Sequence, residues 1–231
     1  MHNLKIHYEG LIYMLTIPQA LDFPMDENSK EIVNFFFELL KKKNNAIYTH
    51  SLQVANYAVS IAANMGLPLP EVAHIKTAAL LHDIGLLSIP NALLAKYPFF
   101  NTREKASYKR HCIAGCSMLE NISDLGPVLK LILHHHETWE GKGYPKRLKG
   151  VNIPLGARII AVADYYDTII NPCTQNWKKT HDDAIKELKR YSGTRFDPEV
   201  VNVFFSVLTH KNMKNPITKE LQNKTKKERS S

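Results

Sequence analysis

A histidine and an aspartate stand at the end of an apolar helical pattern that begins near Val72. Apolar residues recur there in steps of three and four, and the pattern runs directly into His82 and Asp83, followed by Gly85. A buried carboxylate without a partner is costly, so this pair needs hydrogen bonds or another ligand. We expect Gly85 to end the helix in the left-handed cap conformation. For one such pair alone, a hydrogen-bonded core histidine beside a helix-terminal aspartate is the simpler interpretation.

Four further helical patterns carry histidine or aspartate on their apolar faces. They cover Ile47–Met65, Tyr108–Leu119, Val128–His136 and Leu155–Ile170. Spacings of three, four and seven residues place side chains on one face of a helix. The patterns predict an all-α protein, a helical bundle whose facing helices direct polar groups inward. The inward residues of all five patterns are His50, His82, Asp83, His111, His135, His136, Asp164 and Asp167.

So many inward imidazoles and carboxylates are hard to satisfy by hydrogen bonds with one another. Neutral imidazoles and carboxylates are good ligands for first-row transition metals, so a metal centre resolves the problem. This set exceeds what one ion needs from a protein if positions stay open for water, and it suits two ions that share a bridging group. The seven candidate metal ligands are His50, His82, Asp83, His111, His135, His136 and Asp164.

An ordered series of short motifs surrounds these residues between positions 45 and 207. The motifs are His50-Ser51, His82-Asp83-Ile84-Gly85, His111 with Gly115, His135-His136-Glu137, Gly143-Tyr144-Pro145, Arg158-Ile159, Ala163-Asp164 with Asp167, and Gly193 with Phe196-Asp197-Pro198. A lone His-Asp pair is a weak signal, whereas the whole series is specific. It resembles the HD-GYP branch of the HD-domain metal-dependent phosphohydrolases. The resemblance implies a five-helix HD core followed by two further helices.

The resemblance also implies how the ligands are shared. It assigns one ion to His50, His82, Asp83 and Asp164, and a second to Asp83, His111, His135 and His136, with Asp83 as the bridge. A hydroxide that bridges the two metals would attack phosphorus. A mixed set of imidazoles and carboxylates suits iron or manganese better than magnesium, with zinc as an alternative. Asp167 is expected to be catalytic by orienting the attacking water, or else to accept a hydrogen bond from a ligand histidine.

Substrates of the HD-GYP branch are cyclic dinucleotides, chiefly cyclic di-GMP, so the resemblance implies a phosphodiesterase. The chain departs from the family pattern at three places. Leu86 replaces the usual lysine, the segment 171–176 lacks the usual arginine, and Ala46 stands where some members carry a glutamate. We therefore expect two ions and not three, and weak cleavage of cyclic di-GMP. The candidate substrate-binding residues are Lys142, Lys146 and Lys178, and Lys179 is a further lysine that could replace the missing charges.

Two other classes of function stay open at this point. The protein could be a phosphohydrolase for another nucleotide, or a metal-containing sensor or interaction module that docks a protein partner through the loop Gly143-Tyr144-Pro145. The surrounding segment 139–154 is rich in glycine and proline and directly follows two candidate ligands, so we expect a structured loop over the site. Turnover of any nucleotide by the metal-loaded protein would separate an enzyme from a binding module.

Length and composition fit one main domain. With 231 residues, 44% of them hydrophobic, we expect a helical domain over 26–210, an irregular or strand-like segment of unknown role over 1–25, and a disordered basic tail over 211–231. The tail carries part of the net charge of +8 but lacks interleaved aromatic residues, so no long nucleic acid is expected as a partner. Three cysteines without a C-x-x-C motif, no signal peptide and no membrane-length apolar run predict a cytoplasmic protein without a membrane partner.

Several local expectations concern helix starts and individual charges. Asn28 and Glu31 predict a capping box at the start of the first helix. Thr102 is predicted to cap a single helix that carries His111. Glu137 is expected to support its neighbours, and Arg158 is expected to form a structural ion pair and not a substrate contact.

Overall fold

The structure, a computed structural model, describes residues 26–172 and 179–214, the last five by their backbone alone. Within these residues the only pairing of strand type is an isolated bridge between Ser192 and Phe196, and all regular elements are helices. The all-α fold class is therefore confirmed. The strand-like segment predicted over 1–25 lies outside the described residues. In the described part of the chain, no helix has both the length and the apolar character needed to cross a membrane.

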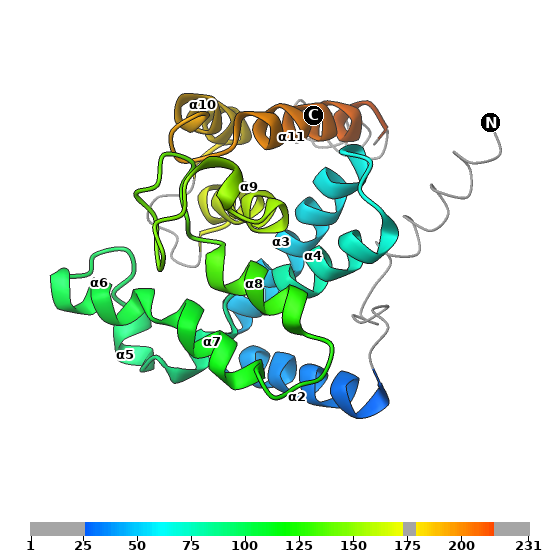
Figure 1. Ribbon diagram of the computed structural model, residues 1–231. Helices are drawn as coiled ribbons and strands as arrows, with labels where there is room; N and C mark the ends of the chain where they lie inside the picture. The colour runs from blue at the N-terminus through cyan, green and yellow to red at the C-terminus, as the bar shows by residue number, and fades with distance from the viewer. Residues whose placement is uncertain (1–25, 173–178, 215–231) are drawn as a thin grey trace, which may run out of the picture.

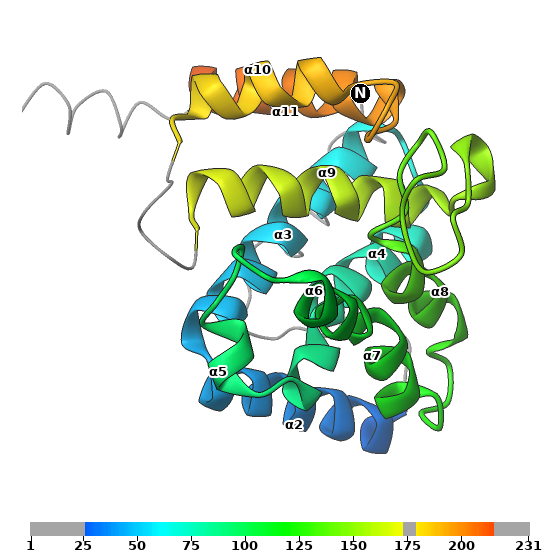
Figure 2. The same ribbon diagram turned by 90° about the vertical axis from the view of Figure 1, so that its left-hand side faces the viewer.

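The helices form a bundle in stacked layers (Figures 1 and 2). In chain order, with η for a 3-10 helix, the elements are α2 (Glu27–Lys43), α3 (Asn45–Asn64), α4 (Leu69–Leu81), η1 (Ile84–Ser88), α5 (Asn91–Leu94), α6 (Thr102–Lys109), α7 (His111–Leu119), α8 (Gly126–His134), η2 (Gly150–Asn152), α9 (Leu155–Ile170), α10 (His181–Tyr191) and α11 (Pro198–Lys214). Helices α10 and α11 form one outer layer above α9, and α2 lies at the opposite end. These last two helices are the C-terminal pair that the resemblance implies.

Helix α3 lies at the centre of the bundle and packs against α4 and α9. Val54, Ala58 and Ile61 on its apolar face are completely buried. Tyr166 from α9 and Phe204 from α11 stack edge to face and close the same core. Burying a large apolar side chain contributes about 1.5–3 kcal/mol, so this contact surface holds in place the helices that carry the candidate ligands.

The cap predicted for the first helix is wrong. Helix α2 is capped by Asp26, whose carboxylate accepts the backbone N–H of Ser29 at 2.9 Å, and not by a capping box at Asn28. Asp26 is the cap because its carboxylate also accepts the Ser29 hydroxyl at 2.7 Å, and this second hydrogen bond fixes the carboxylate at the helix end. At the other end of the domain, α11 continues to Lys214, so the first residues of the predicted disordered tail are helical.

The single helix predicted from Thr102 onward is two helices, α6 and α7, joined at Arg110. Asn101 and Glu104 form the capping box of α6, so Thr102 is the first helical residue and not the cap. The ring of His111 donates to the carbonyl of Tyr108 at 2.7 Å, and in a continuous helix that carbonyl would accept a backbone N–H. The break therefore lets His111 begin a helix with its ring turned toward the bundle interior.

Gly85 does not cap a helix in the left-handed conformation, because α4 already ends at Leu81 and Gly85 lies within η1. The glycine is required for a different reason. A Cβ atom at Gly85 would lie 1.9 Å from the carbonyl oxygen of His111 and 2.6 Å from the backbone nitrogen of Gly115. The backbones of η1 and α7 thus touch, and this contact brings His111 beside Asp83.

We predict that Gly85→Ala destabilises the metal-free protein by about 3 kcal/mol, because the new methyl group meets rigid backbone. Gly126→Ala is the matched control, since a Cβ there meets nothing within 4 Å and should change stability by less than about 1 kcal/mol. Urea unfolding of both variants in the presence of a chelator measures the difference. Equal unfolding midpoints for the two variants would show that η1 and α7 can separate without cost.

Candidate metal centre

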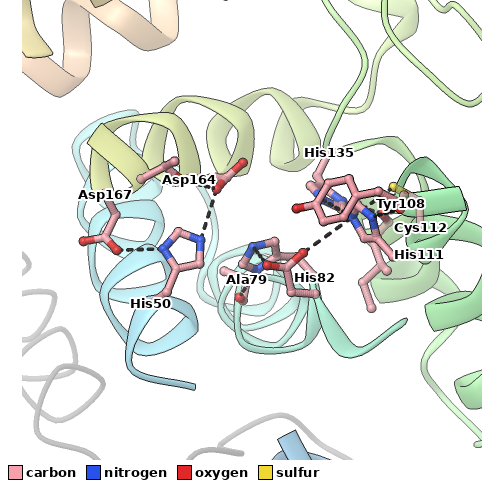
Figure 3. A network of polar contacts seen from close by, with 12 residues as sticks. His50, Ala79, His82, Tyr108, His111, Cys112, His135, Asp164 and Asp167 are labelled. Carbon is pink, nitrogen blue, oxygen red and sulfur yellow. Dashed lines mark hydrogen bonds and ion pairs between the residues drawn. The ribbon is translucent and has the colours of Figure 1, made fainter. Parts of the chain in front are cut away.

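The structure gathers the candidate ligands from five helices at one place in the bundle. Figure 3 shows the polar groups in a row, from Asp167 on α9 and His50 on α3, past His82, to His111 and His135. Most of them stand at helix ends: His82 follows the last residue of α4, His111 is the first residue of α7, and His135 follows α8. Three overlapping groups of these side chains have ligand atoms within 4.8 Å of one another. The groups are His50, His82 and Asp164; His82, Asp83 and His135; and His111, Cys112, His135 and His136.

Three of the histidines share one orientation. In His82, His111 and His135, the Nδ1 atom lies 2.7 Å from the backbone carbonyl oxygen three residues earlier. A carbonyl oxygen can only accept, so Nδ1 carries the proton in each ring. The Nε2 atom of each ring is then left with a lone pair directed into the cluster, which is the state in which imidazole binds a metal.

These lone pairs face groups that cannot satisfy them. The Nε2 atoms of His111 and His135 are 3.4 Å apart, and with both protons on Nδ1 neither can donate to the other. The buried Nε2 atoms of His82 and His136 have no hydrogen-bond partner among the described residues. Buried polar atoms are rarely left unpaired, and a transition-metal ion can accept the electron pair of each of these nitrogens. The residues present therefore fit a divalent transition metal.

Asp83 lies between the two halves of this cluster. Its Oδ2 atom is 3.4 Å from Nε2 of His82, and its Oδ1 atom is 3.5 Å from Nε2 of His111. Each carboxylate oxygen thus faces the lone pair of a different histidine, an arrangement that is repulsive unless a cation stands at each side. This geometry is what a bridging carboxylate requires.

His50 is held differently, because both of its ring nitrogens face carboxylates. Nδ1 lies 2.7 Å from Asp167 and Nε2 lies 3.1 Å from Asp164. Burial disfavours the charged imidazole, but the hydrogen bonds to Asp164 and Asp167 outweigh it and raise the pKa of His50 well above its ordinary value. In the metal-free protein His50 is therefore an imidazolium between two carboxylates.

Asp167 is completely buried and is not among the residues that line the cleft described below. Its second oxygen accepts the side-chain amide of Asn171 at 2.9 Å. Both oxygens are thus engaged, which is the placement of a residue that orients a ligand histidine. The alternative expectation, that Asp167 contacts the attacking water, stays a prediction.

Cys112 belongs to the same group as His111, His135 and His136. Its sulfur lies 3.5 Å from Nε2 of His111, and the side chain is completely buried. Burial raises the pKa of the Cys112 thiol far above its ordinary value, so the sulfur keeps its proton in the metal-free protein. Burial lowers the pKa of a histidine, because the protonated form is the charged one, and the pKa of the nearby His135 falls to about 3.

The loop Gly143-Tyr144-Pro145 packs directly onto the candidate ligand His136. A Cβ atom at Gly143 would lie 2.5 Å from the carbonyl oxygen of His136, so only glycine allows this approach. The backbone N–H of Tyr144 donates to that same carbonyl at 3.2 Å, and the Tyr144 ring lies 4.9 Å from the imidazole, centroid to centroid. The motif therefore faces inward and covers the site, as expected. A protein partner for its outer side stays a prediction.

Two polar residues fix the loop, in line with their expected supporting roles. Glu137, which is buried, accepts the backbone N–H groups of Lys146 at 2.7 Å and Leu148 at 3.1 Å. Arg158 forms an ion pair with Asp197 at 2.5 Å and donates to a backbone carbonyl. The prediction that Arg158 is structural agrees with this placement.

A cleft of about 390 Å³ opens over the candidate ligands. Its floor includes His50, Asp83, His136 and Asp164. Aromatic residues Tyr97 and Tyr108 contribute to its lining, with ring centroids 5.6 Å apart. The remaining lining includes Leu86, Tyr165, Lys179, Glu187 and Arg195. The cleft thus combines metal ligands, aromatic faces and cationic groups.

The predicted substrate-binding lysines do not reach this lining. Lys142 is exposed and pairs with Glu140 at 2.8 Å, and neither Lys142 nor Lys146 lines the cleft. Lys178 lies outside the described residues. Arg195 was missed in the sequence, although it directly precedes Phe196-Asp197-Pro198, one of the motifs that carry the resemblance. Its position beside this motif was the signal in the sequence that could have identified Arg195 as a candidate.

Comparison with known proteins agrees with this fold. A family model described as HD domain matches residues 34–200, and the chain belongs to this HD-domain family. A cyclic di-GMP phosphodiesterase from Thermotoga maritima is 32% identical over 222 residues, which cover 90% of this chain and 60% of the relative. A 3'3'-cGAMP-specific phosphodiesterase 2 from Vibrio cholerae is 31% identical over 88% of this chain and 38% of its own length. The chain spans less than two thirds of these relatives.

Solved structures support the fold. An HDG"Y"P protein from Bdellovibrio bacteriovorus has a TM-score of 0.60 at 21% identity, covering 88% of this chain and 69% of its own. A cyclic GMP-AMP specific phosphodiesterase of V. cholerae has a TM-score of 0.59 at 19% identity, covering 84% and 53%. At these identities the solved structures show the fold alone, and the HD-domain family model and the phosphodiesterase relatives agree with the resemblance.

The depressed pKa of His135 predicts how the metal-free protein responds to acid. Its pKa is about 3 in the folded state and 6.5 when unfolded, so between pH 7 and pH 5 only the unfolded chain gains this proton. Stability then falls as the pH falls, by up to about 2 kcal/mol for this group. His135→Asn keeps a donor for the carbonyl but cannot titrate. Between pH 7 and pH 5, we expect the unfolding free energy of His135→Asn to fall by up to about 2 kcal/mol less than that of the wild type.

Urea unfolding with a chelator at pH 7, 6 and 5 measures this difference. Comparing the two proteins cancels the opposite contribution of His50, whose raised pKa acts in both. If the unfolding free energies of the wild type and His135→Asn changed equally with pH, His135 would accept a proton in the folded state as well.

Proposed function

We propose that the chain is a metal-dependent phosphodiesterase of the HD-GYP type that hydrolyses a cyclic dinucleotide. The observation that carries the proposal is the placement of Asp83, whose two oxygens face different histidines at the floor of an open cleft. The relatives are named as phosphodiesterases for cyclic di-GMP or for 3'3'-cGAMP, and these names suggest a cyclic dinucleotide as the substrate class. We take cyclic di-GMP as the first substrate to test.

The proposed centre holds two divalent ions, iron or manganese, because a mixed imidazole and carboxylate set suits these metals. One ion would be held by His50, His82, Asp83 and Asp164, and the other by Asp83, His111, His135 and His136. When bound, such ions lower the pKa of a coordinated water and offset the negative charge of a phosphodiester. The chain itself orients the candidate ligand rings by hydrogen bonds from Nδ1–H. The acceptor is a backbone carbonyl for His82, His111 and His135, and it is Asp167 for His50.

The cleft also suits the rest of the proposed substrate. A cyclic dinucleotide presents two bases and two phosphodiesters in one ring. Stacking on an aromatic side chain is worth about 1–3 kcal/mol per base, and Tyr97 and Tyr108 both contribute ring surface to the lining. Its volume of about 390 Å³ falls in the range of small-molecule sites.

One observation favours a second candidate, a metal-containing nucleotide sensor. Leu86 lies in the cleft lining and is almost fully buried, so the position of the usual lysine offers no charge to a substrate. A binding module would need the metal centre and the aromatic surface but not efficient catalysis. Turnover decides between the two.

We predict two tightly bound metal ions per chain after anaerobic purification in iron- or manganese-replete medium. Asp83→Ala should lose both ions, since it faces both halves of the site, whereas His135→Ala should mainly deplete one. Asp124→Ala, an exposed aspartate outside the three ligand groups, is the control and should keep both. Elemental analysis of the purified proteins gives the counts. Retention of two ions by Asp83→Ala would remove the bridge from the proposal.

We predict that the metal-loaded protein converts cyclic di-GMP to a linear product, slowly because two expected cationic contacts are absent. Two missing charge-assisted contacts of roughly 1.5–3 kcal/mol each correspond to about a hundred- to ten-thousandfold in kcat/KM. A panel of cyclic di-GMP, 3'3'-cGAMP and cyclic di-AMP, with Asp83→Ala as the blank, measures turnover by product chromatography. Binding without turnover of any of the three would favour the sensor instead.

A further inference from the structure

Arg195 places a guanidinium group in the lining of the cleft. The guanidinium carbon lies 4.3 Å from the centroid of the Tyr165 ring and 5.2 Å from that of Phe196. Tyr165 directly follows the candidate ligand Asp164 on α9, and both line the same cleft. Arg195 is thus anchored on the residue next to the metal centre.

The backbone beneath this side chain is fixed from two sides. The carbonyl of Tyr191, at the end of α10, accepts the N–H of Arg195 at 3.0 Å. The carbonyl of Arg195 in turn accepts the N–H of Trp139, which begins the loop over the site, at 3.1 Å. Gly193 has a φ of 79°, in the left-handed region that favours glycine, and makes the turn between them possible. The arginine is therefore held in place before any ligand arrives.

Arg195 has no ion-pair partner among the residues that the structure describes. Lys179, the one lysine among the lining residues, forms an ion pair with Glu187, which also accepts the Tyr165 hydroxyl at 2.9 Å. No carboxylate lies within ion-pair distance of Arg195 in the described part of the chain. A guanidinium stacked on a ring keeps its N–H edges free, and it matches the oxygens of a phosphate in a bidentate way.

We propose that Arg195 is a substrate-binding residue that holds the phosphodiester that is not being cleaved. The inference rests on the proposed function, in which the other phosphodiester lies over the metal ligands. A cyclic dinucleotide keeps its two phosphodiesters at a fixed separation, so a cation at the cleft wall and a metal centre at its floor grip the same molecule at two points. Arg195 thereby supplies a cationic contact in a cleft where Leu86 offers none.

The test compares Arg195→Ala and Arg195→Lys with wild type, all metal-loaded. Arg190→Ala is the matched control, because Arg190 also stacks on an aromatic ring, that of Tyr191, but does not line the cleft. We expect Arg195→Ala to raise KM for cyclic di-GMP by about 10- to 100-fold, the value of one charge-assisted contact. Arg195→Lys should recover part of this loss, since it keeps the charge but not the fork.

A second substrate makes the test specific. Bis(p-nitrophenyl) phosphate has a single phosphodiester, so its kcat/KM should be nearly the same in Arg195→Ala as in the wild type. Unchanged metal content and unfolding midpoint show that the variant is intact. An equal loss on both substrates would overturn the proposal, because Arg195 would then act on the metal centre. A loss for cyclic di-GMP but none for cyclic di-AMP would also overturn it, in favour of a contact to guanine.

The outcomes also separate this inference from the proposed function. If the wild type cleaves cyclic di-GMP and Arg195→Ala does so with the same KM, the inference fails and the function stands. If the wild type cleaves no cyclic dinucleotide, the function fails, and equilibrium binding of fluorescent cyclic di-GMP takes the place of kinetics. A 10- to 100-fold weaker affinity of Arg195→Ala would then support the inference, and equal or absent binding would refute it.

Discussion

The hydrogen bonds between histidine Nδ1 atoms and backbone carbonyls determine much of what this structure can do. They fix the protons of His82, His111 and His135 on the outside of the cluster and turn three lone pairs inward. The bonds are local, because each joins a histidine to the residue three positions earlier, so they form wherever the helix end forms. The bundle then has to bring these helix ends together against their mutual repulsion, and the apolar packing around α3 holds them there.

Much of the candidate site could be predicted from the sequence, because helix periodicity alone decides which face a side chain occupies. His50 shares a face with Val54, and Asp164 shares one with Ile160, so their inward direction followed from spacing. The all-α class followed from the same patterns. The grouping of ligands into two halves around Asp83 came from the family resemblance and not from periodicity.

Features that depend on contacts between distant segments could not be predicted. Gly85 looks like a helix cap in the sequence, but its role comes from the backbone of α7, 26 residues later. Lys142 looks available for a substrate, yet the course of the loop carries it away from the cleft. Arg195 lies far along the chain from every ligand and reaches the site only because α10 and the loop at Trp139 fix its backbone.

The double hydrogen bonding of His50 has a consequence for how the centre is filled. In the metal-free protein a proton on this ring balances the charge of Asp164 and Asp167, so it serves as a placeholder for a cation. An ion that binds Nε2 must expel that proton, while the proton toward Asp167 can stay. Metal uptake at His50 would therefore replace one positive charge by another, and acid and chelators would both favour the metal-free state.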